Sequence, residues 1–434
     1  MIEYIGWSVK MIPKLDEYKK RWHISSDPAI KPGLDAMTEA LALVKNPQND
    51  LPVIHLAGTN GKGSTVTFIE HIAQQHGLKT ATFMSPCIED VHDQIQLNEK
   101  PITPKEMNAV FQIMHDAGLD GKLTDFELLT VAAFLAFSRF QPDIAIIECG
   151  MGGRFDCTNV MIPVVSVVPS IALEHTNFLG DTLRKIAYHK SGIIKKDRPI
   201  VTGALPTEAM EVFEEEATKQ SAPLYVFNKD FSVETTKDGE KYINPNYEFT
   251  NLKRIMPGIH QRSNMALAIT AFTLFAGEKN IKIDSTKLQK GIHEAHLAGR
   301  FEKIVPNLYI DGAHNPASAK ALIKSIKEEF PGKKIHFIVG MLKDKNIEGV
   351  LRLLEEIGTS FTFVDVANER AMPAEMIYDI SHSKNKRVSD EDIIRIIDEK
   401  LDETSIVIMT GSLYLLTQWR KALLTRFKCT KFLY

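Results

Sequence analysis

A glycine-rich segment in the first quarter of the chain carries side chains suited to binding phosphate. It reads HLAGTNGKGST (55–65), with a lysine and three hydroxyl residues among its glycines. The apolar run 51–57 predicts a buried strand before it, and apolar spacing over 66–73, ending at Gly77, predicts a helix after it. A glycine turn between strand and helix points backbone N–H groups and the helix dipole at one place. That place suits a phosphate group.

The residue types within this segment fit nucleotide chemistry. Its three glycines allow backbone angles and close approaches that a Cβ would block. Lys62 can reach the β- and γ-phosphate oxygens, and Ser64 or Thr65 can offer a hydroxyl to Mg²⁺. The spacing differs from the common G-x-x-x-x-G-K-[ST] because Gly63 follows the lysine. A plain glycine turn is the alternative, but the order of strand, loop, lysine and helix favours a site for ATP or GTP.

A carboxylate follows another predicted buried strand. The segment PDIAIIECGMGGRFDCTN (142–159) places Glu148 near the carboxyl end of a strand over 143–149. Ligands of open α/β sheets bind outside this end, where a carboxylate can hold Mg²⁺ beside a triphosphate. A buried acid capping a loop is the alternative, and we favour the metal. The glycines at 150, 152 and 153 lack the spacing of a dinucleotide fingerprint.

A third segment, 170–203, also combines a strand end, a loop and a helix. His175 follows the strand, Asp181 is expected to cap the helix, and Lys190 lies near the helix end. Judged from the residues alone, His175 is an ordinary loop histidine. Lys190 is a solvated lysine that complements the helix dipole.

The composition excludes several classes of partner. The 434 residues have a net charge of −3 and a pI near 6.5, which gives no electrostatic case for nucleic acid or an anionic membrane. Apolar runs such as 130–137 are too short to cross a bilayer, and the N-terminal segment does not resemble a signal peptide. The four cysteines form no CxxC pair, so we expect neither zinc nor a disulfide framework. We expect a cytoplasmic protein.

The order of predicted elements indicates an α/β protein. Strands are expected at 51–57, 79–85, 143–149, 163–170, 198–203 and 222–227, with helices between most of them. This alternation predicts a mostly parallel sheet covered by helices. Residues 231–251 alternate polar and apolar around Asp238-Gly239, which predicts a small antiparallel appendage. Helices are expected at about 260–277 and 285–296.

A second alternating series follows an expected linker at 296–302. Its strands are expected at 307–311, 334–340, 360–366 and 405–410. Its helices are expected at about 316–330, 346–356, 374–382, 390–401 and 412–426. The fold prediction is therefore a P-loop domain over residues 1–297, followed by a smaller Rossmann-like α/β domain over 298–434.

Several long motifs give the chain a family resemblance. They read GTNGKGST, ECGMGGRFDCTN, EHTNFLGDTLRKIAYHKSGI, HQRSNMALA, AGRFE and DGAHNP. Their order resembles that of the folylpolyglutamate synthase/dihydrofolate synthase family, within the Mur ligase superfamily. The similarity runs from about residue 30 to the end, where GSLYLL (411–416) resembles the family's last strand–helix turn. It implies a central-type ATP-binding domain at 1–297 and a glutamate-binding domain at 298–434.

The resemblance implies roles for particular residues. ATP-binding positions would be Asn60, Gly61, Lys62, Gly63, Ser64, Thr65, Asn264 at the adenine, and Arg300 and Asp311 at phosphate and ribose. Two Mg²⁺ ions would be held by Ser85, Glu148 and His175, with Ser64 a further ligand. Lys190 matches a lysine that is carbamylated in the family, and this CO₂-derived group would bind the second ion.

The acceptor side is implied in the same way. Its positions correspond to Thr124, Asp125, Phe126, Glu127, Phe155, Asp156 and Cys157, while His314 and Asn315 would face the incoming glutamate. Phe126 and Phe155 could stack on a pterin ring, and core packing is the alternative for both. The chain departs from the family pattern at Cys87, Asp93 and Gln94, in a loop that in the family lies by the folate substrate. It also departs at Asp125, and Glu174 replaces the usual aspartate.

The implied enzyme is an ATP-dependent acid–amino-acid ligase of the EC 6.3.2 type. A carboxylate of dihydropteroate or a folate would attack the γ-phosphate, and the amine of L-glutamate would then attack the acyl phosphate. We expect a monomer. The alternatives are a Mur ligase for a UDP-muramoyl substrate, a P-loop kinase or GTPase-like switch, and a non-catalytic nucleotide-binding paralogue. Only about 50 residues precede the P-loop, which disfavours the first alternative, and the absence of N-K-x-D disfavours a GTPase.

Overall fold

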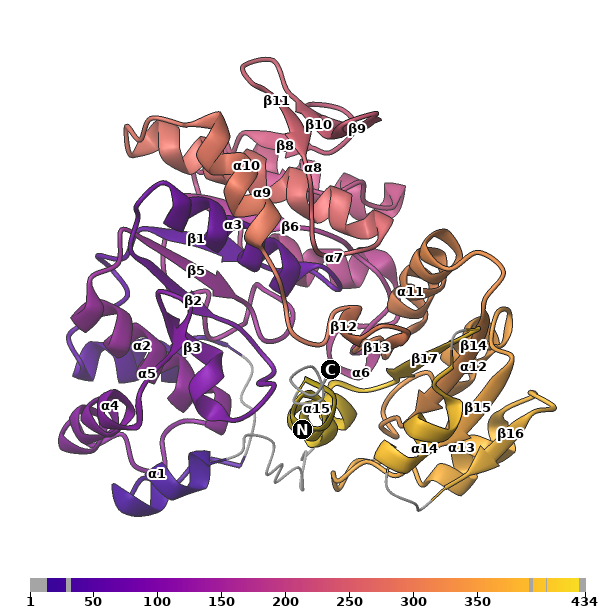
Figure 1. Ribbon diagram of the computed structural model, residues 1–434. Coiled ribbons are helices and arrows are strands. Elements are labelled where there is room, and N and C mark those ends of the chain that lie inside the picture. Colours follow the sequence, from indigo (N-terminus) through magenta and orange to yellow (C-terminus); the bar gives the residue numbers. More distant parts are fainter. Residues whose placement is uncertain (1–13, 29–32, 390–392, 403, 429–434) are drawn as a thin grey trace. The chain divides into compact units, whose positions relative to one another are not determined.

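The computed structural model describes residues 14–28, 33–389, 393–402 and 404–428 (Figure 1). The chain divides into two compact units. The first contains the described residues up to Ile255 together with Arg262–His296, and the second contains Met256–Gln261 and the described residues from Leu297 onward.

The main sheet of the first unit has eight strands in the order β4-β3-β2-β5-β1-β6-β7-β8. They are β1 (Val53–Leu56), β2 (Thr80–Phe83), β3 (Ile95–Leu97), β4 (Lys100–Pro101), β5 (Ile144–Glu148), β6 (Val165–Val168), β7 (Ile200–Thr202) and β8 (Leu224–Val226). The six expected strands are all present and parallel. The sequence did not predict β3 and β4, which extend the sheet antiparallel beside β2.

Helices cover this sheet. They are α1 (Leu15–Arg21), α2 (Asp35–Leu43), α3 (Lys62–Gln75), α4 (Pro104–Asp116), α5 (Asp125–Phe140), α6 (Thr176–Leu179), α7 (Leu183–Ser191), α8 (Thr207–Lys219), α9 (Ile259–Glu278, in this unit from Arg262) and α10 (Ser285–Glu294), with a 3₁₀ turn η1 (Val91–Gln94). Helix α5 is buried without interruption from Leu128 to Phe137, because it packs on the sheet residues Ala145 and Ile147 and also on α2 and α4. On α10, a Cβ at Gly291 would lie 2.7 Å from the Ile72 Cα, so glycine allows α10 to approach α3 closely (Figure 1).

The antiparallel appendage is present as a three-stranded sheet. It consists of β9 (Ser232–Thr236), β10 (Gly239–Ile243) and β11 (Glu248–Leu252) in the order β11-β10-β9. Thr236 pairs with Gly239, whose φ of +141° suits glycine, so the turn lies where the Asp238-Gly239 pair predicts it.

The second unit has a six-stranded sheet in the order β12-β13-β17-β14-β15-β16. Its strands are β12 (Glu302–Val305), β13 (Leu308–Ile310), β14 (Lys334–Val339), β15 (Ser360–Phe363), β16 (Lys386–Val388) and β17 (Ser405–Thr410). Its helices are α11 (Pro316–Glu329), α12 (Ile347–Glu355), α13 (Ala374–Ile380), α14 (Ile393–Lys400) and α15 (Leu413–Lys428). All neighbouring strands are parallel except β12 and β13. Phe337, Phe361 and Phe363 lie in the core between sheet and helices.

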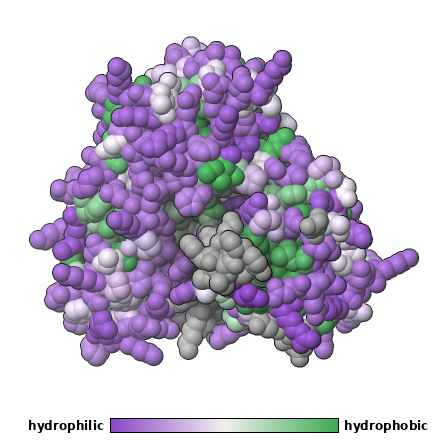
Figure 2. Space-filling model, viewed as in Figure 1, coloured by the Kyte–Doolittle hydropathy of each residue, from purple (hydrophilic) through white to green (hydrophobic). Residues whose placement is uncertain are grey.

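Most predicted elements of this unit are confirmed. The expected linker at 296–302 ends in Glu302, the first residue of β12, and neither β12 nor β16 was predicted. The first three residues of the helix expected at 390–401 lie outside the described residues. Among the described residues, no helix is long and apolar enough to cross a membrane. On the face drawn in Figure 2, hydrophilic residues predominate.

Candidate active site

Four neighbouring parallel strands bring the predicted site residues of the first unit to one edge of the sheet. Strands β2, β5, β1 and β6 are adjacent, and Glu148 at the end of β5 pairs with Leu56 at the end of β1. Ser85 lies two residues beyond β2, and His175 lies in the loop after β6. The carboxyl ends of parallel strands meet at one edge, which is where α/β sheets bind ligands.

The glycine-rich loop is held from the neighbouring strand end. Ser170 fixes it, because its hydroxyl accepts a hydrogen bond from the Asn60 amide and donates one to the Asn60 carbonyl, both at 2.9 Å. Gly61 lies immediately before α3 with φ +90°, and a Cβ there would approach the Asn264 Oδ1 to 2.5 Å. Asn264, the predicted adenine contact, therefore lies directly against this loop.

Two lysines converge on one carbonyl of the loop. The Gly58 carbonyl accepts a hydrogen bond from the Lys62 ammonium at 3.0 Å and from the Lys190 ammonium at 2.7 Å. The Lys62 ammonium also lies 3.5 Å from a carboxylate oxygen of Glu148. Burial, with the charge of Lys62 as a second cause, lowers the pKa of Lys190 to about 8. Lys190 is only 3% exposed, so the solvated lysine expected from the residues alone is wrong.

The loop and strand ends offer oxygen ligands of the kind Mg²⁺ prefers. Glu148 and Ser64 are both buried, and Glu148 already faces a cation. The Thr65 hydroxyl donates to the Gly61 carbonyl at 2.8 Å, so Ser64 is the better placed of the two for a metal. Within the described ranges no group of three or more His, Cys, Asp or Glu could hold a metal. Mg²⁺ at nucleotide sites takes one or two carboxylates and completes its shell with phosphates and water, so these residues fit it.

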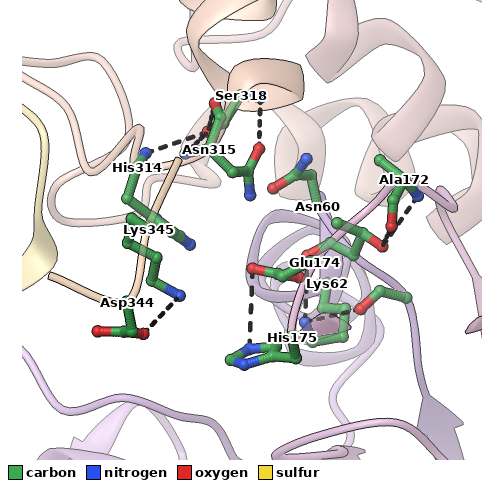
Figure 3. Close-up of polar contacts among 12 residues, drawn as sticks. Asn60, Lys62, Ala172, Glu174, His175, His314, Asn315, Ser318, Asp344 and Lys345 are labelled. Atoms are coloured by element: carbon green, nitrogen blue, oxygen red, sulfur yellow. Dashed lines mark hydrogen bonds and ion pairs between the residues drawn. The ribbon is translucent and has the colours of Figure 1, made fainter. Parts of the chain in front are cut away.

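The loop after β6 places His175 in a constrained conformation. His175 precedes α6 with φ +51°, and its Nε2 lies 3.9 Å from the Glu174 carboxylate (Figure 3). A non-glycine residue with positive φ is uncommon and is often found at functional sites. The cap expected from Asp181 is wrong: the Thr182 hydroxyl accepts the Lys185 amide, and Asp181 pairs with the Lys185 side chain instead.

The predicted acceptor residues at the start of α5 have clear structural roles. Thr124 and Glu127 form a reciprocal capping box at the helix N-terminus. The Phe126 ring stacks on Phe83 with centroids 5.7 Å apart, and a Cβ at Gly150 would collide with it. Core packing therefore accounts for part of the Phe126 surface, and the side chain is only partly buried.

The second acceptor segment divides into one exposed and two buried side chains. Phe155 is 49% exposed, as a stacking surface requires. Asp156 is buried, which raises its pKa, and it accepts bonds from the Met151 amide at 2.8 Å and from the Thr158 hydroxyl and amide. Cys157 is buried beside the Thr130 hydroxyl at 3.1 Å. The buried, hydrogen-bonded side chains of Asp156 and Cys157 thus stabilise the conformation of this loop.

In the second unit, Arg300 and Asp311 lie close together. The Asp311 carboxylate accepts the amides of Phe301 and Ala313, each at 2.8 Å. Burial raises the pKa of Asp311, and the nearby Arg300 charge opposes this. A Cβ at Gly312 would lie 3.3 Å from a guanidinium nitrogen of Arg300.

His314 and Asn315 lie at the N-terminus of α11. The His314 Nδ1 lies 2.8 Å from the Gly312 carbonyl, and the Asn315 side chain accepts the Ser318 amide at 2.8 Å (Figure 3). In the same figure Lys345 pairs with Asp344 at 3.6 Å. A helix N-terminus favours a carboxylate, as expected where glutamate binds.

The sequence prediction missed two residues that shape these segments. Ser170 holds the glycine-rich loop, and the only signal was a Pro-Ser pair after a strand. Ser318 completes the capping box of α11, and its spacing from Asn315 could have revealed it.

Comparisons with known proteins assign the chain to a family. The Mur ligase middle domain matches residues 56–272, and the Mur ligase glutamate ligase domain matches residues 299–413. A dihydrofolate synthase/folylpolyglutamate synthase of Bacillus subtilis is 37% identical over 410 residues, which cover 91% of this chain and 95% of that protein. The chain belongs to the folylpolyglutamate synthase/dihydrofolate synthase family.

Further relatives support this membership. A folylpolyglutamate synthase of Lacticaseibacillus casei is 33% identical, covering 87% of this chain and 91% of its own. The structure of E. coli FolC in complex with DHPP and ADP has a TM-score of 0.87 at 25% identity, covering 95% and 98% of the two chains. The family is one of ATP-dependent ligases, and the structure confirms its α/β fold.

Proposed function

We propose that this member of the family is an ATP- and Mg²⁺-dependent ligase that joins L-glutamate to a folate, to dihydropteroate, or to both. One observation carries the proposal: Lys62, Lys190 and Glu148 converge at the carboxyl edge of the parallel sheet, beside the glycine-rich loop that precedes α3. The names of the relatives supply the acceptor class.

The residues of the first unit have separable roles in this reaction. Asn60 to Thr65 would hold the triphosphate through backbone amides, and Lys62 would neutralise the developing charge on the transferred phosphoryl group. Glu148, Ser64, Ser85 and His175 would hold Mg²⁺, which would offset the negative charge of the triphosphate. The acceptor carboxylate would then attack the γ-phosphate to give an acyl phosphate and ADP, and the glutamate amine would displace phosphate.

Lys190 has the environment that carbamylation requires. Only a neutral amine adds CO₂, and the lowered pKa of Lys190 leaves a useful neutral fraction near neutral pH. Lys190 is only 3% exposed, so a carbamate there would place a negative charge in a buried position. The cations available to balance it would be Lys62 and Mg²⁺. We propose this modification as the source of a further metal ligand.

The remaining assignments follow the domain prediction. We propose that residues 1–297 bind ATP and the acceptor, with Phe126 and Phe155 against the pterin ring. Residues 298–434 would supply Arg300 and Asp311 for the nucleotide and His314 and Asn315 for glutamate. We further propose a cytoplasmic monomer with small-molecule substrates and no nucleic-acid or membrane partner.

Phosphate release from ATP tests this function. The assay contains Mg²⁺ and L-glutamate, with dihydropteroate, a tetrahydrofolate or no acceptor. Release with dihydropteroate alone indicates a dihydrofolate synthase, release with tetrahydrofolate alone a polyglutamylating enzyme, and release with both a bifunctional one. ATP binding without stimulation by either acceptor would refute the proposal.

A further inference from the structure

The segment that contains α1 is anchored in the core of the first unit. Leu15 and Tyr18 on α1, and Ile24 after it, are buried in the same hydrophobic cluster as α4 and α5. The Tyr18 ring lies 5.4 Å from Phe111 of α4. This burial fixes the helix, so its polar side chains are presented in defined directions.

One end of α1 is bonded to the loop that follows Ser85. Lys14, just before the helix, pairs with Asp90 at 2.5 Å, and the Tyr18 hydroxyl lies 2.6 Å from the Nε2 of His92. The other ring nitrogen of His92 lies 2.6 Å from the same Asp90 carboxylate. The hydroxyl, imidazole, carboxylate and ammonium form one continuous chain from α1 into the loop 85–94.

The other end of α1 is bonded to the start of α5. The Lys19 ammonium lies 2.8 Å from the Asp125 carboxylate, and the Ser26 hydroxyl donates to the same carboxylate oxygen. Asp125 lies between Thr124 and Phe126, two of the proposed acceptor-binding residues. Helix α1 therefore contacts both the loop 85–94 and the N-terminus of α5.

The acids in these two elements are already engaged. The Asp93 carboxylate accepts the amides of Ile88 and Glu89 at 2.9 and 2.6 Å, while Asp90 and Asp125 hold α1. These acids thus attach α1 and shape the loop. Partly exposed ion pairs contribute at most about 1 kcal/mol each to stability, so global folding depends little on them. The relative position of two binding elements is more sensitive, because misplacement of about 1 Å can cost 100-fold in rate.

We propose that residues 14–26 form a strap that sets the position of the loop 85–94 against the start of α5, and so determines how tightly the acceptor binds. Lys19 and Tyr18 are its positioning residues, acting through Asp125 and His92. This inference rests on the proposed ligase function.

Steady-state kinetics of the full chain test the strap. The variants are Lys19→Met, Asp125→Asn, the double variant and Tyr18→Phe, which keeps the buried ring. The matched control is Lys20→Met, because Lys20 is the exposed neighbour on the same helix and forms no ion pair with the described residues. KM for the acceptor, KM for ATP, kcat and Tm are measured for each.

We expect the acceptor KM to rise roughly 3- to 10-fold in both single variants of the ion pair and in Tyr18→Phe, with the KM for ATP unchanged. The double variant should be no worse than either single one, because both remove the same contact. Lys20→Met should match the unmodified protein. A lower Tm with unchanged acceptor KM, or equal effects on the KM of acceptor and ATP, would overturn the strap. If the unmodified chain shows no acceptor-stimulated turnover, the proposed function fails, and the strap with it.

Discussion

The buried carboxyl of Glu70 should make the stability of the first unit depend on pH. Glu70 lies on α3 and is 3% exposed, and its carboxyl accepts the Thr80 hydroxyl at 3.0 Å. Burial raises its pKa from 4.5 to about 7, and the negative charge of Glu99 contributes. The folded chain therefore keeps a proton on Glu70 that the unfolded chain releases.

The sign and size of the effect follow from this difference. Below about pH 4.5 both states hold the proton, and the stability is fully present. As the pH rises from about 4.5 to about 7, Glu70 loses its proton in the unfolded chain but keeps it in the folded chain. This ionisation increasingly favours the unfolded state. The gap between the two pKa values corresponds to about 3 kcal/mol of lost stability at pH 8.

Glu70→Gln removes the titration but keeps an oxygen that can accept the Thr80 hydroxyl. We expect the Tm of the variant minus that of the unmodified chain to be small at pH 5 and to rise by about 5 °C at pH 8, since about 2 °C per kcal/mol applies to a unit of this size. The nearby His71–Glu99 pair is present in both proteins, so it affects this difference only through its electrostatic coupling to Glu70.

Thermal unfolding followed by circular dichroism at pH 5, 6, 7 and 8 gives the measurement. Glu39→Gln, on the exposed side of α2, is the matched control and should show no such rise. A Tm difference for Glu70→Gln that stays constant from pH 5 to pH 8 would refute the reasoning, because it would mean that the carboxyl ionises equally in both states.

Three further predictions concern the site itself. In urea unfolding, Thr124→Ala should lower the free energy of unfolding by about 1 kcal/mol, because the Thr124 hydroxyl caps α5. Thr124→Ser keeps a hydroxyl and should leave the free energy of unfolding unchanged. Glu148→Gln should reduce acceptor-stimulated phosphate release by about 100-fold or more and raise the Mg²⁺ concentration it requires, since the buried carboxylate is the proposed metal ligand. With ¹³C-bicarbonate, NMR should show a carbamate signal that grows from pH 7 to pH 8 and is absent in Lys190→Met, because the amine must lose its proton near pH 8.

The sequence predicted the parts of the site that depend on local order along the chain. A strand, a glycine turn and a helix occur consecutively, so the loop around Lys62 could be recognised from its residues. The same holds for Glu148, which ends a continuous apolar strand. Their meeting at one sheet edge followed from the general rule for parallel strands.

The sequence could not reveal contacts made between distant segments. Lys190 seemed a surface lysine because its neighbours are polar, yet the fold buries it against Gly58, 132 positions away. The cap of α7 was misplaced by one residue because Asp181 and Thr182 both suit a cap, and only backbone geometry decides. Short strands such as β16 have too few residues for a periodic pattern.

The two lysines at Gly58 differ in exposure, and we expect them to have different roles. Both ammonium groups donate to one carbonyl, and the charge of Lys62 contributes to the lowered pKa of Lys190. The Lys62 side chain is 15% exposed and faces Glu148, whereas Lys190 is enclosed and has a lowered pKa. Burial therefore selects Lys190 as the lysine whose charge can change. Converting it from a cation to a neutral or anionic group would remove the repulsion at Gly58 and leave Lys62 to face the phosphate groups of ATP.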